Sequence, residues 1–439
     1  MAYDYRQDAF YQKETINVTW IMIWNGSTET HWWNPDEYWG TRAYVDGKYQ
    51  SIDWNNPQHL EEYFHQMRLA GIDVIASDLT NGLGWIPQTQ QIQRLCLQYG
   101  MKLCVAINHH GKAAEYEDIA QKIWEACADP ESELGAAYLY KDGKPLMVNY
   151  CWYDEFEAMQ KLGGEYGGRF SGMWASGEFS RPDKWGWQVD PQAGFLPSGD
   201  SMFLTSSINY DSPRTGDHLW RKSLAWLDYG FMVAAKAKPK FRIIGSYDDV
   251  HEHNSWLKCD TRNASRGWQM RNAEGALSTD VYYDRVKEWL QDGWAKPFHE
   301  GGSLRDGVYT IVSMDHGAEF APRENRMELS PLRVTMPESA LSRYYWLYHL
   351  GKDEYRIIKL NSGFSLEAAA MREGMPVRQN YDDETYNQRW RITGTPAGYS
   401  IVNRLYNKAL TLDYSGDIVT CTDAGAANQR WELTPVMTL

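Results

Sequence analysis

Three acidic residues fall within five positions of the segment SYDDVHEHNSW, namely Asp248, Asp249 and Glu252. Hydrolysis of a glycosidic bond needs one carboxyl group that protonates the leaving oxygen and a second, ionised one that acts as base or nucleophile. Carboxyl groups this close cannot all ionise, so the pKa of one of them must rise. The spacing predicts acid–base catalysis, with Glu252 as general acid and Asp249 as base or nucleophile. A solvated acidic loop is the alternative.

The elements that would position these acids can be read from the alternation of patterns before them. Up to about residue 300, short apolar or β-branched runs alternate with amphipathic stretches that have apolar residues at i, i+3, i+4 and i+7. This alternation is typical of strand–helix units around a parallel sheet. We count eight strands, at 18–24, 73–78, 102–108, 146–150, 172–176, 185–189, 202–209 and 241–247. The sequence therefore predicts an α/β domain over 1–300, folded as a (β/α)₈ TIM barrel.

The active site of such a barrel lies at the carboxyl ends of its strands. Polar and aromatic residues stand at those ends here. We expect substrate to be bound by Trp24, Asp78, Asn108, His109, Tyr150, Trp174, Asn209, Tyr247 and Asp248. For some of these a structural role is the alternative: Asp78 could cap the following loop, His109 could be a hydrogen-bonded wall residue, and a single tryptophan is more often packing.

Metal and cofactor chemistry have weaker support. The His-Glu-His run at 251–253 and the pair His109 and His110 could suggest a metal site, but the H-E-x-x-H and C-x-x-C spacings are absent from the sequence. The sequence also lacks a phosphate loop, a G-x-G-x-x-G fingerprint and a G-x-S-x-G elbow. We expect no metal and no other cofactor.

Composition narrows the choice of partners. The chain carries 44 basic and 58 acidic residues, a formal net charge of −14, which disfavours nucleic acid and anionic membranes. Its apolar runs are shorter than the ~18 residues needed to span a bilayer. Trp (21) and Tyr (29) outnumber Phe (12), and their flat faces with polar edges suit sugar rings, although packing could also use them. We expect a monomer whose partner is a polysaccharide or oligosaccharide.

After about residue 300 the sequence pattern changes to short predicted strands that are separated by glycine residues. Three segments begin with an aromatic-aliphatic strand and end in a Trp-aliphatic strand, with Trp346, Trp390 and Trp431 spaced 44 and 41 residues apart. A threefold repeat of short strands indicates one unit used three times around a shared core. The sequence predicts an all-β trefoil over 301–439. Because no Ser/Pro-rich linker precedes it, we expect it to pack against the first domain.

The two NQRW motifs, at 387–390 and 428–431, resemble the Q-x-W repeats of ricin-type β-trefoil lectins, with RYYW as a degenerate third motif. In that family an acidic residue early in each repeat holds sugar together with an aromatic residue. The resemblance implies a sugar site at Asp413 and Tyr414 in the third repeat. The second repeat has Glu367 in the acidic place, and the first departs most.

The passages HQMRLAGIDVIASD and YDDVHEHNSW resemble the barrels of glycoside hydrolase families 71 and 99, which contain endo-α-1,3-glucanases and endo-α-mannosidases. Asp249 and Glu252 stand where those families carry their two carboxylates, whereas His253 replaces a Gly or Ser. The resemblance implies a glycoside hydrolase that acts on an α-linked polysaccharide of glucose or mannose. Endo cleavage is favoured because a lectin domain helps most on a long chain.

Two other functions remain open. One is a non-catalytic glycan-binding protein built on an inactive barrel, and the other is a transglycosylase of the same architecture. The start MAYDYRQDAFYQKE has neither a basic n-region nor an apolar h-region. We expect an extracellular or periplasmic protein whose leader has been removed, with retention inside the cell as the alternative.

Overall fold

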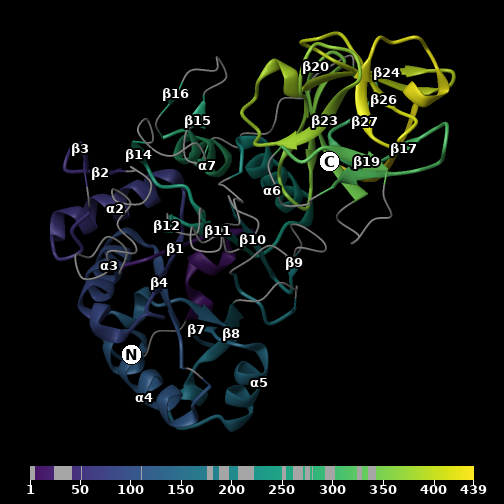
Figure 1. The fold of residues 1–439 in the computed structure, drawn as a ribbon. Coiled ribbons are helices and arrows are strands. Elements are labelled where there is room, and N and C mark those ends of the chain that lie inside the picture. Colours follow the sequence, from purple (N-terminus) through teal and green to yellow (C-terminus); the bar gives the residue numbers. More distant parts are fainter. Residues whose placement is uncertain are drawn as a thin grey trace.

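A computed structural model describes residues 5–23, 42–50, 52–109, 111–175, 181–186, 197–205, 222–249, 254–260, 270–271, 277–278, 280–291, 302–323, 329–334 and 343–439. They form an N-terminal α/β domain and a C-terminal all-β domain (Figure 1). In this part of the chain no helix is both long enough and apolar enough to cross a bilayer.

Parallel strands form the centre of the α/β domain. In sheet order they are β8 (Ser171–Ala175), β7 (Lys144–Tyr150), β5 (Lys102–Ile107), β4 (Val74–Asp78), β1 (Ile16–Ile21), β11 (Phe241–Ser246) and β10 (Ser201–Leu204). Short antiparallel strands extend the sheet: β6 (Tyr140–Lys141), β9 (Pro197–Ser198), β12 (Asp248–Asp249) and β13 (Asn254–Ser255), where β13 also pairs in parallel with β11. The sheet is therefore mixed but mostly parallel.

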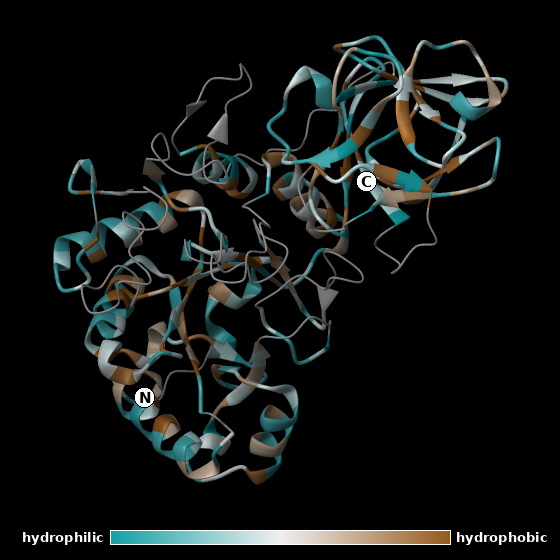
Figure 2. Ribbon diagram, viewed as in Figure 1, coloured by the Kyte–Doolittle hydropathy of each residue, from teal (hydrophilic) through white to brown (hydrophobic). Residues whose placement is uncertain are grey.

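Helices cover this sheet, and sequence patterns explain where they form. They are α2 (Pro57–Ala70), α3 (Ile86–Tyr99), α4 (Ala113–Ile123), α5 (Tyr153–Leu162), α6 (Leu224–Ala237) and α7 (Val281–Gln291). The start of α2 is fixed by Pro57 at its first position and by the Asn56 side chain, which accepts from the Gln58 N–H at 3.0 Å. Every residue of β1, β4 and β5 is buried, as expected for parallel strands covered on both faces, and Figure 2 shows apolar strands beneath helices of mixed hydropathy.

The predicted α/β class is confirmed, but the predicted barrel is not shown. Seven of the eight predicted strands are present with shifted ends, and most of the sixth, at 185–189, lies outside the described residues. The described strands form an open path from β8 to β10 and not a closed ring. What is shown is an α/β domain with a mixed, mostly parallel sheet.

The C-terminal domain consists of three repeats of four strands. The first holds β17 (Gly307–Ser313), β18 (Phe320–Pro322), β19 (Leu332–Val334) and β20 (Tyr344–Gly351); the second holds β21 (Glu354–Lys359), β22 (Ser365–Ala368), β23 (Met375–Asn380) and β24 (Arg389–Thr395); the third holds β25 (Gly398–Asn403), β26 (Ala409–Leu412), β27 (Ile418–Cys421) and β28 (Trp431–Thr438). The outer strands of the repeats pair in the closed ring β17-β20-β21-β24-β25-β28, and the inner strands form three hairpins. This is the predicted β-trefoil.

The register of the first repeat differs from the prediction by one residue. In each repeat an aromatic side chain donates a hydrogen bond to the carbonyl of the neighbouring hairpin. The three donor–acceptor pairs are Tyr345–Phe320 at 2.7 Å, Trp390–Leu366 at 3.0 Å and Trp431–Leu410 at 3.1 Å. Tyr345, and not Trp346, is therefore the counterpart of the two motif tryptophans. Because successive side chains of a strand point to opposite faces, Trp346 points out of the trefoil core.

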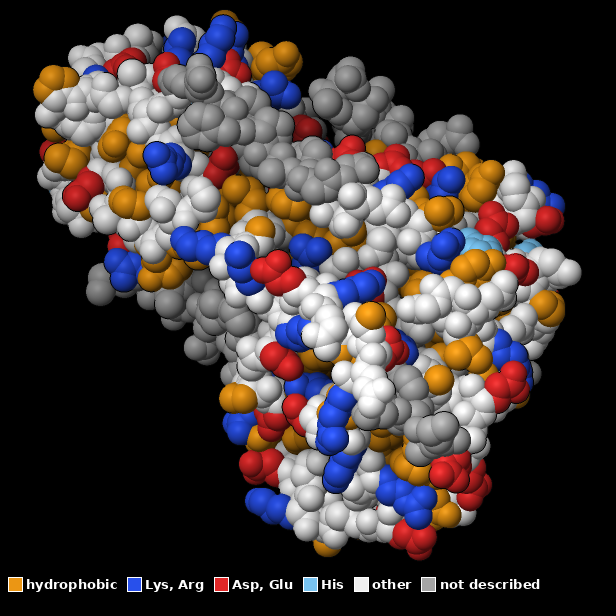
Figure 3. Space-filling view, turned by 180° about the vertical axis from the view of Figure 1, so that it is seen from behind, with side chains coloured by type: hydrophobic (Ala, Val, Ile, Leu, Met, Phe, Trp, Pro, Cys, Tyr) orange, Lys and Arg blue, Asp and Glu red, His pale blue; other side chains and the backbone are white. Residues whose placement is uncertain are grey.

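Trp346 instead joins the two domains. Its ring lies 5.0 Å from that of Tyr229 on α6, and it belongs to the hydrophobic core of the α/β domain. Helix α6 is buried along most of its length because the sheet covers one side and the trefoil another. On the face of the molecule seen in Figure 3, acidic and basic side chains are interspersed, although the formal net charge of the whole chain is −14.

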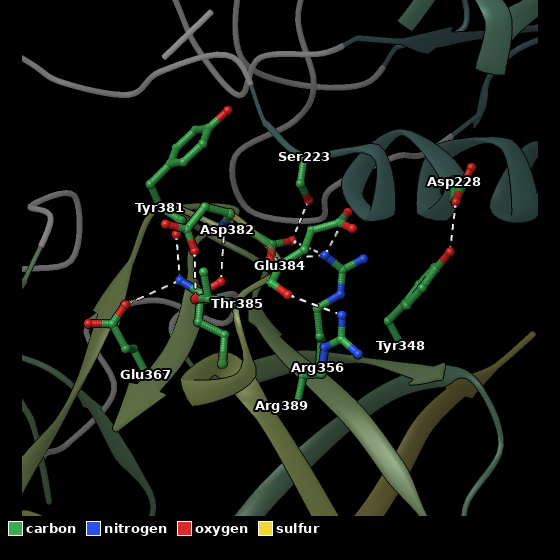
Figure 4. Close-up of polar contacts among 12 residues, drawn as sticks. Ser223, Asp228, Tyr348, Arg356, Glu367, Tyr381, Asp382, Glu384, Thr385 and Arg389 are labelled. Atoms are coloured by element: carbon green, nitrogen blue, oxygen red, sulfur yellow. Dashed lines mark hydrogen bonds and ion pairs between the residues drawn. The ribbon is translucent and has the colours of Figure 1, made fainter. Parts of the chain in front are cut away.

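Polar contacts reinforce this interface (Figure 4). The Tyr348 hydroxyl donates to the buried carboxylate of Asp228 on α6 at 3.0 Å, and Ser223 donates to Asp382 at 2.5 Å. Asp382 also accepts from the buried guanidinium of Arg356 at 3.0 Å. The two domains are therefore connected by apolar, hydrogen-bonded and ionic contacts at once.

Candidate functional site

The carboxyl end of β11 carries two of the three predicted acids. The chain continues there into β12, which pairs antiparallel with β13 so that Asp248 faces Ser255 and Asp249 faces Asn254. Both aspartates are 2% exposed, and Asn254 is 4% exposed. Two carboxyl groups are thus removed from water at the end of a central parallel strand.

Burial has a clear electrostatic effect on Asp248. Burial raises the pKa of this carboxyl most, backbone hydrogen bonds oppose the rise and the nearby charge of Asp78 adds to it, and together these effects bring the pKa to about 7. One of these hydrogen bonds comes from the Met22 N–H, at 2.8 Å from Oδ1. Asp248 is therefore partly protonated near neutral pH, as acid–base chemistry requires of one member of such a group.

Asp78 ends β4, the strand next to β1, and is buried. Its Oδ1 accepts from the backbone N–H and the hydroxyl of Thr80, at 2.8 and 2.7 Å. Asp78 therefore caps the following loop, which was the alternative to its predicted role in substrate binding. Asp78 also influences Asp248 through its charge, so the structure brings these two predicted residues together.

The sequence interpretation did not select Thr205 and Asn254, which also lie at this end of the sheet. The Thr205 hydroxyl, directly after β10, donates to the Oδ1 of Asn254. Both side chains are buried. The predicted strand 202–209 ran past Thr205, which concealed it as a strand-end residue. With its true end at Leu204, the rule that sites gather at strand ends would have found it.

The predicted residues on β5, β7 and β8 have mixed surroundings. His109 is buried, its Nδ1 accepts from the Gly111 N–H at 3.2 Å, and its ring packs against Tyr116, which fits a wall residue. Trp174 is 2% exposed and donates to the carbonyl of Cys151 at 2.9 Å. Asn108 and Tyr150 are half-buried.

The side chain of Tyr247 packs against α2. Its hydroxyl donates to Gln66 of α2 at 2.5 Å, and its ring packs edge-on against Tyr63 and Trp256. Burial raises its pKa well above the ordinary value. The side chain is fully buried beneath a helix, in a packing position.

Three predicted residues, Trp24, Asn209 and Glu252, lie outside the described residues. In sequence, Glu252 belongs to the four residues that connect the paired Asp249 and Asn254. Within the part of the chain that the structure describes, no three His, Cys, Asp or Glu side chains are grouped so as to hold a metal ion.

In the trefoil, Asp413 and Tyr414 follow β26 in a tight turn. The Oδ1 of Asp413 accepts from the N–H and hydroxyl of Ser415 at 2.9 and 2.7 Å and from the N–H of Asp417 at 2.8 Å. The side chain of Tyr414 is fully exposed. A fixed carboxylate and an exposed ring therefore stand side by side on the surface.

Glu367 is not the counterpart of Asp413. Gln388 donates to Glu367 as Gln429 donates to Thr411, so Glu367 matches Thr411. Its carboxylate is buried and accepts from Arg378. The predicted alignment of Glu367 with Asp413 was therefore wrong, because the counterpart of Glu367 lies two residues earlier, at Thr411.

Residues 343–417 match a known family, described as ricin-type beta-trefoil lectin domain-like. The C-terminal domain is a ricin-type β-trefoil lectin domain. No curated protein matches the sequence. The match to the lectin family supports carbohydrate binding by the C-terminal domain.

Three similar solved structures each align with 30% of this chain. ThreeFoil, a designed 3-fold symmetric protein, is 22% identical, is covered over 100% of its length and has a TM-score of 0.29. An exo-β-1,3-galactanase from Clostridium thermocellum is 24% identical, is covered over 30% and has a TM-score of 0.28. A GlcNAcα1-4Gal-releasing endo-β-galactosidase from Clostridium perfringens is 14% identical, is covered over 33% and has a TM-score of 0.26. This chain aligns with about a third of either glycosidase, and the α/β domain has no family assignment from these matches.

Proposed function

We propose that the protein is a glycoside hydrolase that cleaves an α-linked polysaccharide of glucose or mannose within the chain. The observation that carries this proposal is the buried acid group at the carboxyl end of β11. There Asp248, with a pKa of about 7, neighbours Asp249 in a two-residue strand. A carboxyl that holds its proton near neutral pH, as Asp248 does near the charge of Asp78, is one of the two kinds of acid that glycoside hydrolysis uses.

The strand order supports a closed (β/α)₈ barrel as the scaffold. The strands from β1 to β8 follow the chain in one direction, and the last strand, β11, returns to pair with β1. At the other end of the path, Lys184 forms a parallel bridge with Trp174 of β8, and its carbonyl accepts from the Ser201 hydroxyl of β10 at 2.9 Å. These contacts support closure through the segment around Lys184, which would take the place of the sixth strand.

In this proposal Glu252 donates the proton to the leaving oxygen, and Asp249 acts as base or nucleophile. In sequence, Glu252 stands three residues after Asp249 and two residues before Asn254, which is paired with Asp249. Asp78 favours retention of the proton on Asp248 because it adds negative charge to a desolvated site.

The lectin domain gives a reason for action on a polymer. A second binding site on the same chain raises the effective concentration of substrate after each cleavage. The interface around Trp346 and Asp228 holds the lectin domain against the α/β domain. We propose that the protein works outside the cell or in the periplasm, where it would meet such polymers.

A non-catalytic glycan-binding protein is the second candidate. It is favoured by the family match, which covers part of the lectin domain alone, and by the internal hydrogen bonds of Asp78 and Trp174. A transglycosylase would share the catalytic group and differ in its products.

A polysaccharide digestion panel tests the proposal. The full chain is incubated with α-1,3-glucan, α-mannan and a β-glucan, and reducing ends and product sizes are followed. We expect reducing ends from an α-linked polymer, with oligosaccharides as early products. Products longer than the starting chains would indicate a transglycosylase, and inertness on every α-glucan and α-mannan would contradict the proposal.

A further inference from the structure

Trp152 is an exposed indole at the carboxyl end of a sheet strand. It is 77% exposed, whereas every other tryptophan among the described residues is buried or half-buried. It stands two residues after the end of β7 and immediately before α5. An indole that remains in water at this edge of the sheet loses the stabilisation that burial would give it. A binding role would account for its exposure.

The backbone that carries this indole is firmly held. The Trp152 N–H donates to the Glu155 carboxylate at 3.0 Å, and its carbonyl accepts from the Phe156 N–H at 3.0 Å, so Trp152 caps α5. Glu155 in turn packs against Gly111, where a Cβ atom would lie 2.7 Å from its Oε1. The start of α5 is thus fixed against the loop that follows His109, and the indole projects from a rigid base.

Polar groups that could bind hydroxyls surround the residue that follows Trp152. Tyr153, the next residue, packs edge-on against Trp174, and the guanidinium of Arg181 lies 3.6 Å above its ring. The Tyr153 hydroxyl accepts from Arg181 at 2.5 Å and donates to Asp183 at 2.9 Å. The side chains of Arg181 and Asp183 are 37% and 33% exposed. A partly exposed donor and a partly exposed acceptor thus contact the residue that follows the exposed indole.

We propose that Trp152, Arg181 and Asp183 form a carbohydrate subsite at the carboxyl ends of β7 and β8. A pyranose ring would stack its C–H face on the indole, and its hydroxyls would bind the guanidinium and the carboxylate. The substrate class rests on the proposed function. The subsite lies away from the acids, because β5, β4 and β1 separate β7 from β11 in the sheet. It would therefore hold a sugar unit remote from the bond that is cleaved.

Fluorine NMR of the full chain labelled with 5-fluorotryptophan tests this subsite. Trp152→Phe assigns the Trp152 resonance, and oligosaccharides prepared from α-1,3-glucan and from α-mannan are the probes. We expect one probe to shift this resonance, and Trp152→Ala to weaken its binding about 3- to 10-fold. Leu162→Ala, at the opposite end of α5 and 63% exposed, is the matched control and should leave binding unchanged.

The readout separates this proposal from the catalytic one. A Trp152 resonance that shifts while the chain releases no reducing ends supports the subsite and contradicts the hydrolase. An unmoved resonance with both probes overturns the subsite, whether or not the same oligosaccharides are cleaved. If the subsite holds, Trp152→Ala should raise KM for long chains and leave the cleavage of short oligosaccharides unchanged.

Discussion

The ring of Trp346 on β20 lies 5.0 Å from the ring of Tyr229 on α6, at the point where the lectin domain meets the α/β domain. Both side chains are at least 98% buried. The contact makes one strand of the trefoil part of the core of the other domain, so the stability of the two domains should be coupled.

Replacing Trp346 with Ala should uncouple them. Removal of a buried tryptophan costs about 3 to 5 kcal/mol, and here the loss falls on the interface. We expect the single thermal transition of the full chain to separate into two in differential scanning calorimetry. Trp390→Ala, in the trefoil core, is the control and should lower the stability of the trefoil without this separation. An unchanged single transition in Trp346→Ala would contradict the coupling.

Asp248 should make stability depend on pH. Its pKa is about 7 in the folded protein against an ordinary value of 3.8, so between these values the folded state binds a proton that the unfolded chain has released. The contribution of Asp248 to stability is therefore lost as pH rises from about 4 to 7, by up to about 4 kcal/mol. Asn does not titrate, so the Tm of Asp248→Asn relative to the native protein should rise over this range.

Thermal denaturation at intervals between pH 4 and pH 8 measures this difference. Asp118→Asn, at a carboxylate that is 58% exposed, serves as the control and should show no such trend. A difference in Tm between Asp248→Asn and the native protein that stays constant with pH would show that the carboxyl is not protonated in the folded state.

Sugar binding by the lectin domain should depend on Asp413 and Tyr414. The carboxylate is oriented by three hydrogen bonds and the ring is fully exposed, so either substitution with Ala should reduce retention of the full chain on immobilised α-glucan or α-mannan. Tyr386→Ala removes another exposed aromatic residue, from the second repeat, and should retain binding. Unchanged retention of both site variants would indicate that this repeat is structural.

The strands and most helices could be predicted because their periodicity is local. The buried runs of β4 and β5 and the amphipathic pattern of α2 mark their own positions. The register of the first trefoil repeat could not be predicted, because Tyr345 and Trp346 are adjacent aromatic residues. Which of them faces the trefoil core depends on pairing with distant strands and on the contact with α6.

The residues of the candidate site could likewise be predicted only in part. Asp248 and Asp249 were found because three acids stand close together in sequence. The hydrogen bonds that Asp78 accepts from Thr80 and the burial of Tyr247 beneath α2 depend on side-chain direction, which strand ends alone do not specify. Trp152 escaped notice because it lies two residues beyond Tyr150, the last residue of the predicted strand, and directly before α5.

The release of reducing ends by catalytic variants tests the central claim most directly. Glu252→Gln and Asp249→Asn are compared with the native protein and with Glu165→Gln, at an exposed carboxylate remote in sequence, on the α-linked polymer that the native protein cleaves. Retention on the same polymer serves as the test of folding. We predict a loss of roughly 10²- to 10⁴-fold in rate for each of the two site variants, with retention and the control unchanged. Full activity in either site variant would contradict the assignment of these carboxyl groups as the catalytic pair.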